Sequence, residues 1–299
     1  MTDPAVLFCV GATKAGTTWF YRLLHDHPDC AVPAVKEAHY WDTFDADDRA
    51  KQVAAFRIRL REMRDLKAEA LAADRGWQVR NLDRRIADMK SLIAVVEGDR
   101  SDDAAYLVWL TQGRGQARLF VDMTPNYSTL PDAMLDRMVH AVPNAKVVYL
   151  MRDPLDRLWS HIRMQARRQR QSHEVYEKKA NNILYRMLNK GQETHILDRG
   201  DYAGVIRKLR RVVPADRLFV AFAETLMTAE GAARLCAFLG IAPVKDLPGE
   251  AVHEGPPVVM LEKLRPRAQK LLYEQYDWVA RNVGPLPQNW QDNCVRMTA

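Results

Sequence analysis

The feature that most restricts the fold is the beginning of the chain, where an apolar run leads through a loop into an amphipathic segment. Residues 6–10 (VLFCV) form a short apolar run typical of a buried strand, and Gly11 ends it. Apolar residues then recur with helical spacing from residue 17 to residue 27, and Pro28 closes that segment. The chain therefore opens with a strand, a glycine-containing loop and a helix.

The rest of the chain continues to alternate between strands and helices. Further strands are predicted at residues 119–121, 146–151 and 218–222, and helices at residues 229–239 and 261 to about 283. Asp153 is a good helix N-cap and Pro154 a good first helical residue, so another helix should follow the strand at 146–151. This alternation predicts an α/β fold of three αβα layers around a central parallel sheet, with ligands bound at the carboxyl ends of the strands.

One segment departs from this alternation. From residue 47 to about residue 98, apolar residues recur every three or four positions among many charged ones, and Asp74-Arg75-Gly76 resembles a turn. The pattern predicts a helical hairpin, residues 47–98, inserted into a single domain that spans residues 1–299. Its dense charge is most simply a solvated face, and a lid over a bound substrate is the alternative.

Composition excludes several classes of protein. The net charge of +6 suits an anionic ligand, and the basic residues do not form the stripe with interleaved aromatics that nucleic-acid binding needs. No apolar run approaches the roughly 20 residues of a membrane span, and the first residues lack a basic signal region. We therefore expect a cytoplasmic protein without a transmembrane segment. The four cysteines are scattered without a CxxC pair, so reduced thiols and no metal site are expected.

The loop after the first strand reads GATKAGTTW over residues 11–19. Gly11 and Gly16 have the spacing of a phosphate-binding P-loop, and a strand before and a helix after provide its context. An ATPase carries lysine where this chain has Thr17, whereas here the lysine has moved to Lys14, inside the loop. Such a lysine would reach a shorter anion than a triphosphate. The alternatives are an unusual P-loop kinase or NTPase and a plain strand–turn–helix with an exposed lysine.

Residues 14–19 (KAGTTW) resemble the 5′-phosphosulfate loop of PAPS-dependent sulfotransferases, P-loop-like enzymes that transfer a sulfuryl group from 3′-phosphoadenosine 5′-phosphosulfate (PAPS) and release PAP. The family binds the 3′-phosphate with an arginine at a strand end and a serine in the next helix, and Arg152 and Ser160 match this pattern. The resemblance implies a donor site and no metal. Its residues are Lys14, Ala15, Gly16, Thr17, Thr18, Trp19, Arg152, Ser160 and, from the family's GxY segment, Tyr202, for which a buried core position is the alternative.

Residues 36–42 (KEAHYWD) resemble a segment of the bacterial, heparan-sulfate-sulfotransferase-like branch, in which the glutamate removes the acceptor's proton. The resemblance makes Glu37 the general base and Lys14 the group that stabilises charge on the departing oxygen. His39 is the rival base, because other sulfotransferases use histidine. In an extended segment Glu37 and His39 point to the same side, so spacing does not choose between them. A hydrogen-bonded structural histidine is the third possibility.

Two departures from the family pattern concern the second substrate. Met123 stands where a lysine is common, which argues against a polyanionic glycan, and residues 253–257 show no clear match to the Lys-Gly-Arg loop that closes on the donor. The acceptor could therefore be a small molecule, a lipid or a saccharide, sulfated on oxygen or nitrogen. Four arginines could face an acidic acceptor, although a solvated helix face is the simpler interpretation; they are Arg163, Arg167, Arg168 and Arg170. The sequence does not indicate the oligomeric state.

Two rival functions remain at this point. A P-loop kinase would need an acidic residue for magnesium, and Asp122 at a strand end is the only plausible candidate. A non-enzymatic nucleotide-binding module would keep the fold without turnover, and the joint presence of Glu37, Lys14, Arg152 and Ser160 speaks against it.

Overall fold

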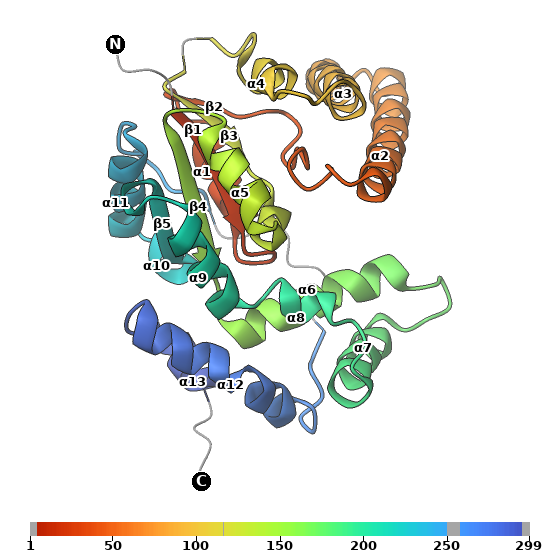
Figure 1. Cartoon of the computed structure of the whole chain (residues 1–299). Helices are drawn as coiled ribbons and strands as arrows, with labels where there is room; N and C mark the ends of the chain where they lie inside the picture. Colours follow the sequence, from red (N-terminus) through yellow and green to blue (C-terminus); the bar gives the residue numbers. More distant parts are fainter. Residues whose placement is uncertain (1–4, 116, 250–257, 295–299) are drawn as a thin grey trace.

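A computed structural model describes residues 5–115, 117–249 and 258–294. Its centre is one sheet of five strands in the order β2-β3-β1-β4-β5, and every neighbouring pair is parallel (Figure 1). The strands are β1 (Ala5–Gly11), β2 (Cys30–Ala31), β3 (Leu119–Asp122), β4 (Ala145–Met151) and β5 (Leu218–Phe222). β1 and β3 are buried along their whole length, which explains their continuous apolar runs. The α/β fold with a parallel sheet is confirmed.

Helices flank this sheet and connect its strands. They are α1 (Thr17–His25), α2 (Ala46–Ala72), α3 (Gly76–Glu97), α4 (Ala104–Thr111), α5 (Asp132–His140), α6 (Pro154–Gln169), α7 (Tyr176–Lys190), α8 (His195–Asp198), α9 (Tyr202–Val212), α10 (Ala223–Leu226), α11 (Ala229–Leu239), α12 (Arg265–Asn282) and α13 (Gln288–Asn293). Two short 3₁₀ turns, η1 (Pro125–Thr129) and η2 (Ala215–Arg217), complete the order. In the described part of the chain, no helix is both long and apolar enough to cross a bilayer.

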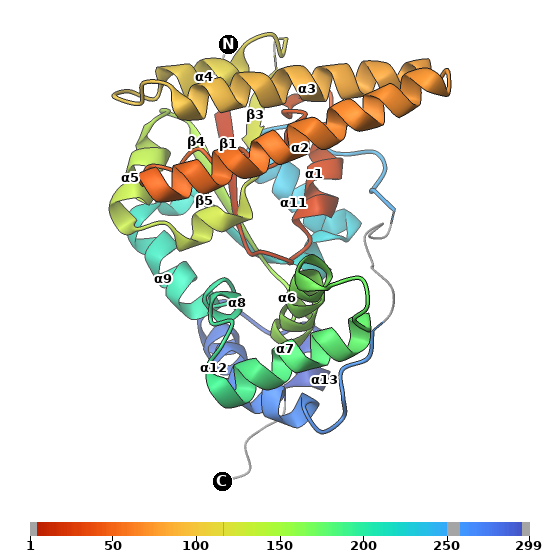
Figure 2. The same ribbon diagram turned by 90° about the vertical axis from the view of Figure 1, so that its right-hand side faces the viewer.

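The predicted hairpin is present as the pair α2 and α3, which pack along each other (Figure 2). Asp45 caps α2 by accepting hydrogen bonds from the backbone N–H groups of Asp47 and Asp48. One face of α2 is buried and the rest is exposed, which accounts for the mixture of apolar and charged residues.

The start of one predicted helix was wrong and one short strand was not predicted, and both errors have a physical reason. The last long helix begins at Arg265 instead of residue 261, because Asn181 binds the backbone of Val259 and Leu261 and holds that stretch in an irregular path. Pro266 then fits the first turn of α12, where no backbone N–H donor is needed. The two-residue strand β2 was not predicted, since so short an edge strand has no periodicity.

The architecture gathers several loops at one edge of the sheet. β1, β3, β4 and β5 all run in the same direction, so the segments that follow them emerge side by side. In both views the α2–α3 pair lies at one end of the molecule and α7, α12 and α13 lie at the opposite end (Figures 1 and 2).

Candidate active site

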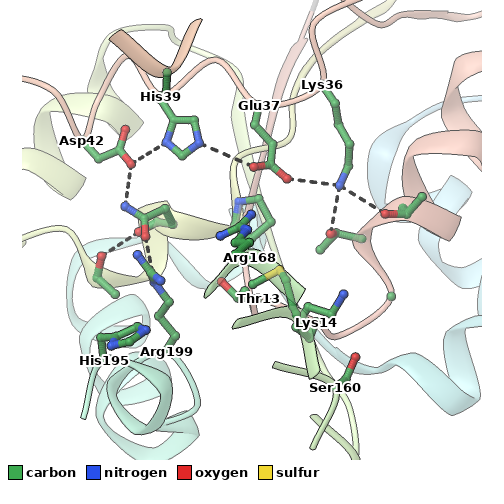
Figure 3. A pocket seen from close by; sticks show the side chains of 18 of the residues that line it. Thr13, Lys14, Lys36, Glu37, His39, Asp42, Ser160, Arg168, His195 and Arg199 are labelled. Carbon is green, nitrogen blue, oxygen red and sulfur yellow. Dashed lines mark hydrogen bonds and ion pairs between the residues drawn. The ribbon is translucent and has the colours of Figure 1, made fainter. Parts of the chain in front are cut away.

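A cavity of about 1490 Å³ opens where the parallel strands end. Its walls come from the loop after β1, residues 36–43, helix α2, the start of η1 and helices α6, α8 and α10. Segments that are far apart in the sequence therefore face one space, and Figure 3 shows many of their polar side chains directed into it.

The loop after β1 has the backbone geometry of an anion site. Lys14 and Gly16 both have positive φ angles, 72° and 87°, and Gly16 is the residue that precedes helix α1. The φ angle of Gly16 favours glycine, and a Cβ atom there would also lie 2.7 Å from Cε of Met227, the mobile end of a flexible side chain. The first N–H groups of an α-helix lack partners within the helix, and Thr17 and Thr18, which begin α1, line the cavity.

Positive charge collects around this loop. Nζ of Lys36 donates to Oγ1 of Thr17 (3.3 Å) and Oγ1 of Thr18 (3.4 Å), which brings a second lysine onto the start of α1. Burial lowers the pKa of Lys14, and repulsion by Arg152 lowers it further. The local charge is thus arranged for an anionic ligand.

Arg152 and Ser160 line the same cavity as Lys14. Arg152 directly follows β4, and Asp153 caps α6 by accepting a hydrogen bond from the N–H of Asp156 (2.8 Å). The fully buried hydroxyl of Tyr202 donates to the carbonyl of Arg152 (2.5 Å) and accepts from its N–H (3.2 Å). Tyr202 therefore holds the backbone of Arg152 and does not itself line the cavity.

The C-terminal helices hold the same turn from the other side. The hydroxyl of Tyr276 in α12 donates to Asp153 (2.9 Å) and accepts from the N–H of Leu155 (3.2 Å). Oε1 of Glu224 accepts from the N–H of Asp153 (3.1 Å) and from the indole N–H of Trp290 in α13 (2.9 Å). Burial raises the pKa of Asp153 to about 6.

Across the cavity from this turn, three side chains form a connected row. Nε2 of His39 lies 3.5 Å from Oε2 of Glu37, and Nδ1 of His39 lies 2.8 Å from Oδ2 of Asp42 (Figure 3). Lys36 contacts the other carboxylate oxygen of Glu37 at 3.4 Å. His39 has a φ of 51°, so the segment is not extended, contrary to the expectation from the sequence. This backbone conformation accompanies the direct contact between the imidazole of His39 and the carboxylate of Glu37.

The charges in this row support one another. Burial would raise the pKa of Glu37, but the contacts with His39 and Lys36 lower it to about 2. Burial would lower the pKa of His39, but its contacts with Asp42 and Glu37 raise it to about 9. At neutral pH Glu37 is therefore a carboxylate and His39 an imidazolium.

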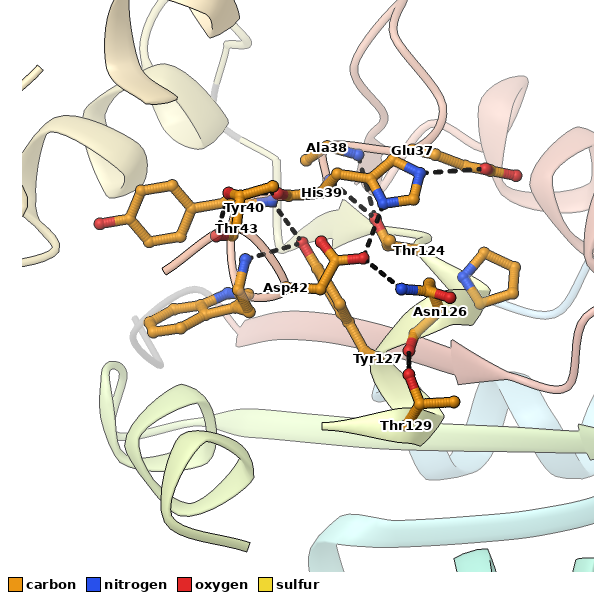
Figure 4. A network of polar contacts seen from close by, with 12 residues as sticks. Glu37, Ala38, His39, Tyr40, Asp42, Thr43, Thr124, Asn126, Tyr127 and Thr129 are labelled. Atoms are coloured by element: carbon orange, nitrogen blue, oxygen red, sulfur yellow. Dashed lines mark hydrogen bonds and ion pairs between the residues drawn. The ribbon is translucent and has the colours of Figure 1, made fainter. Parts of the chain in front are cut away.

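A buried network fixes the loop that carries the row (Figure 4). Asp122, at the end of β3, accepts from the hydroxyls of Tyr106 (2.7 Å), Tyr127 (2.9 Å) and Thr124 (2.7 Å). Thr124 and Tyr127 in turn accept from the backbone N–H groups of Ala38 and Tyr40 at 3.0 Å. Through these hydrogen bonds Asp122 holds the loop of residues 36–43 in place.

A family model described as the sulfotransferase family matches residues 4–246. The chain belongs to the sulfotransferase family. This is an enzyme family that uses PAPS as its donor. A search of curated proteins found no match.

One solved structure shares the fold, and two further solved domains give weaker matches. A sulfotransferase from Alicyclobacillus acidocaldarius is 19% identical with a TM-score of 0.58, and the match covers 97% of this chain and 100% of the other. The sulfotransferase domain of the Synechococcus PCC 7002 olefin synthase is 17% identical with a TM-score of 0.44, covering 91% of this chain and 96% of that domain. A sulfotransferase domain from the curacin biosynthetic pathway is 15% identical, also with a TM-score of 0.44, covering 98% and 96%.

Most of the predicted sulfotransferase residues lie at one site, although their roles stay predictions. Those that line the cavity are Lys14, Gly16, Thr17, Thr18, Trp19, Glu37, His39, Arg152 and Ser160. Ala15 is buried, and its N–H closes the loop onto the carbonyl of Ala12 at 3.0 Å. Tyr202 occupies the core position that was its alternative. Residues 253–257 lie outside the described residues.

Sequence reasoning missed several residues of this site. Asn126 donates to Asp42 (2.6 Å), and Nε of Arg199 donates to Oδ1 of Asn126 (3.0 Å), so both extend the row that begins at Glu37. Asp42 lies three residues after His39, and this spacing was the one available signal. Arg199 is distant in sequence, and the GxY segment of residues 200–202 that directly follows it did not point to Arg199 itself.

Proposed function

We propose that this sulfotransferase moves a sulfuryl group from PAPS to a hydroxyl or amine of an acceptor and releases PAP. The observation that carries the proposal is that Lys14 and Arg152, from separate segments, line one cavity whose size accommodates a nucleotide and a second substrate. The residues present fit the donor. The start of α1 with Lys14 and Lys36 suits the 5′-phosphosulfate, and Arg152 with Ser160 suits the 3′-phosphate.

Each residue then has a chemical task. PAPS supplies an activated sulfuryl group with PAP as its leaving group. Glu37 takes a proton from the acceptor hydroxyl or amine, and His39 holds the carboxylate toward the cavity. Lys14 and the N–H groups of α1 balance the charge that develops on the departing phosphate oxygen.

The charge states favour Glu37 over His39 as the base. With a pKa of about 9, His39 is already protonated at neutral pH, so it cannot take a proton from the acceptor. With a pKa of about 2, Glu37 is ionised, and an acceptor group that displaces Lys36 from it would raise its basicity.

Asp122, the candidate magnesium ligand of the kinase alternative, does not fit that role. Asp122 is 2% exposed, it does not line the cavity, and both of its oxygens accept hydrogen bonds from hydroxyl groups. Within the described residues, no group of three or more His, Cys, Asp or Glu side chains is arranged to hold a metal ion.

Calorimetry with PAP tests the donor assignment. PAP should bind in the micromolar range in the presence of EDTA, and ATP should bind much more weakly. Arg152→Gln should weaken PAP about tenfold or more because it removes a charge-assisted contact to phosphate. Arg170→Gln, outside the cavity, is the control and should bind PAP normally. A strict magnesium requirement with preference for ATP would support the kinase alternative instead.

A further inference from the structure

Three arginines line the cavity in addition to Arg152. Arg163 and Arg168 come from helix α6, and Arg199 directly follows helix α8. In the view of Figure 3, Arg168 lies between Glu37 and the loop residues Thr13 and Lys14, and Arg199 lies below Asp42.

These guanidinium groups are poorly paired. Nε of Arg163 is buried and has no hydrogen-bond partner in the described part of the chain. Arg168 makes no side-chain hydrogen bond or ion pair with any described residue, and Arg199 uses Nε alone, on the neutral amide of Asn126. Arg163 and Arg199 are half-buried, and half-buried arginines are normally paired, so these two lack a partner that a ligand could supply. Arg168 is exposed, but its side chain lines the same cavity.

The nearby acids do not supply the missing partners. Glu37 is engaged by His39 and Lys36, and Asp42 by His39 and Asn126. Asp198 also lines the cavity, yet it forms no ion pair with a described residue. Burial lowers the pKa of Arg199, and repulsion by Arg168 lowers it further, whereas Asp42 and Asp198 only partly offset this.

The donor does not account for all three. An α-helix rises about 1.5 Å per residue, so Arg163 is about 4.5 Å and Arg168 about 12 Å along α6 from Ser160. Arg163 is thus close enough to serve either substrate, while Arg168 lies farther along the helix and Arg199 comes from a different element.

The four arginines singled out in the sequence divide into two pairs. Arg163 and Arg168 line the cavity, whereas Arg167 and Arg170 do not. Arg167 is exposed, and Arg170 lies over the ring of Tyr176 at 5.9 Å. The solvated-face interpretation therefore accounts for Arg167 and Arg170, whereas the half-buried Arg163 and the exposed Arg168 differ from them in lining the cavity.

We propose that Arg168 and Arg199, with Arg163 beside them, bind an anionic group of the acceptor, a carboxylate or a phosphate. The planar guanidinium forks suit such oxyanions, and they would hold the acceptor while its hydroxyl or amine meets Glu37. A single anionic group agrees with the loss of the lysine at Met123, which argued only against a polyanion. This inference rests on the proposed sulfotransferase function of the same cavity.

Inorganic phosphate provides a direct test on the full chain. With the donor site saturated by PAP, phosphate should bind to the wild type and to Arg167→Gln and Arg170→Gln with equal, millimolar affinity. Arg168→Gln should weaken it about tenfold, because one charge-assisted contact is lost, while PAP affinity and the unfolding temperature stay unchanged. Arg199→Gln should act in the same direction.

The outcomes separate the two proposals. If PAP binds but phosphate does not, or if Arg168→Gln binds phosphate like the wild type, the acceptor subsite is wrong and the donor site stands. If PAP itself fails to bind, the proposed function fails. Labelled products made from radioactive PAPS and a cell extract should carry a second anionic group by mass spectrometry; products with the new sulfate as their sole anion would overturn the subsite.

Discussion

At the scale of single residues, the contact between Glu37 and His39 is the feature with the most chemical content. The two groups lie 3.5 Å apart, and each favours the charged form of the other. Their roles are therefore coupled, so a variant of either one must be interpreted through its effect on the partner.

Removing the carboxylate tests the base. Glu37→Gln should leave PAP affinity nearly intact and lower transfer from radiolabelled PAPS to extract acceptors by about 10²- to 10⁴-fold, the usual contribution of a general base. His39→Gln, which keeps a hydrogen-bonding group, should lose much less. A Glu37→Gln protein as active as the wild type, beside an inactive His39→Gln protein, would make His39 the base.

The titration of His39 provides a second check. Its imidazole should titrate near pH 9 by NMR, well above the ordinary value of 6.5, and Glu37→Gln or Asp42→Asn should lower that pKa because each removes a stabilising charge. A normal pKa in the wild type would contradict the row of contacts.

The same shifts set the pH dependence of stability. Because the pKa of His39 is raised, its contribution is complete below about pH 6.5 and is lost as the pH rises toward 9. Because the pKa of Glu37 is lowered, its contribution is present above about pH 4.5 and is lost as the pH falls toward 2. Raising the pH from 7 to 9 should therefore lower the thermal unfolding temperature of the wild type more than that of His39→Gln.

At the scale of elements, α12 and α13 lie beyond the residues matched by the family model, yet they hold the turn that carries Arg152. Tyr276 reaches Asp153 and Leu155, and Trp290 reaches Glu224. Trp290 also packs against Tyr202 and Tyr276, with ring centroids 6.0 Å from each. These helices act as a brace behind the proposed 3′-phosphate site.

A conservative change tests this brace. Tyr276→Phe keeps the ring and removes two hydrogen bonds, so stability should fall by about 1–2 kcal/mol and PAP affinity by about threefold or more. Tyr273→Phe on the same helix is the matched control, since Tyr273 makes no hydrogen bond with the described residues. Unchanged PAP affinity in Tyr276→Phe, with only a lower unfolding temperature, would reduce Tyr276 to a purely structural role.

The parts of the site that local sequence predicts differ from those it does not. The loop from Gly11 to Trp19 was recognisable because strand, loop and helix are adjacent in the chain, and Arg152 because a strand end and a helix cap surround it. The contact of Glu37 with His39 depends on a positive φ that distant residues impose, among them Tyr127. The spacing of Glu37 and His39 in the sequence does not reveal such a constraint.

Contacts over long sequence separations explain the remaining misses. Arg199 reaches Asn126, and Tyr276 reaches Asp153, only because the sheet brings their elements together. The short helices α8, α10 and α13 have too few residues for a periodic pattern. The fold class and the strand–loop–helix arrangement of residues 5–25 were thus predictable, whereas the brace and the position of Arg199 in the cavity were not.

At the scale of the whole molecule, the cavity is assembled from both halves of the chain, so a ligand that spans it should link them. At about one hundred times its dissociation constant, PAP should add about 2.7 kcal/mol to the free energy of unfolding. Calorimetric unfolding should show a higher transition temperature with PAP and EDTA, and much less of an increase in Arg152→Gln. An equal increase in Arg152→Gln would place PAP elsewhere.

One wall of the cavity has a different origin from the others. Helix α2 contributes Gln52, Ala55, Ile58 and Arg59, while the proposed donor residues come from the loop after β1, the start of α1, the end of β4 and helix α6. Substitutions along that face of the hairpin would reshape the room left for the acceptor without disturbing the nucleotide. Homologous proteins could consequently differ in the acceptor that they sulfate while keeping the same residues for binding PAPS.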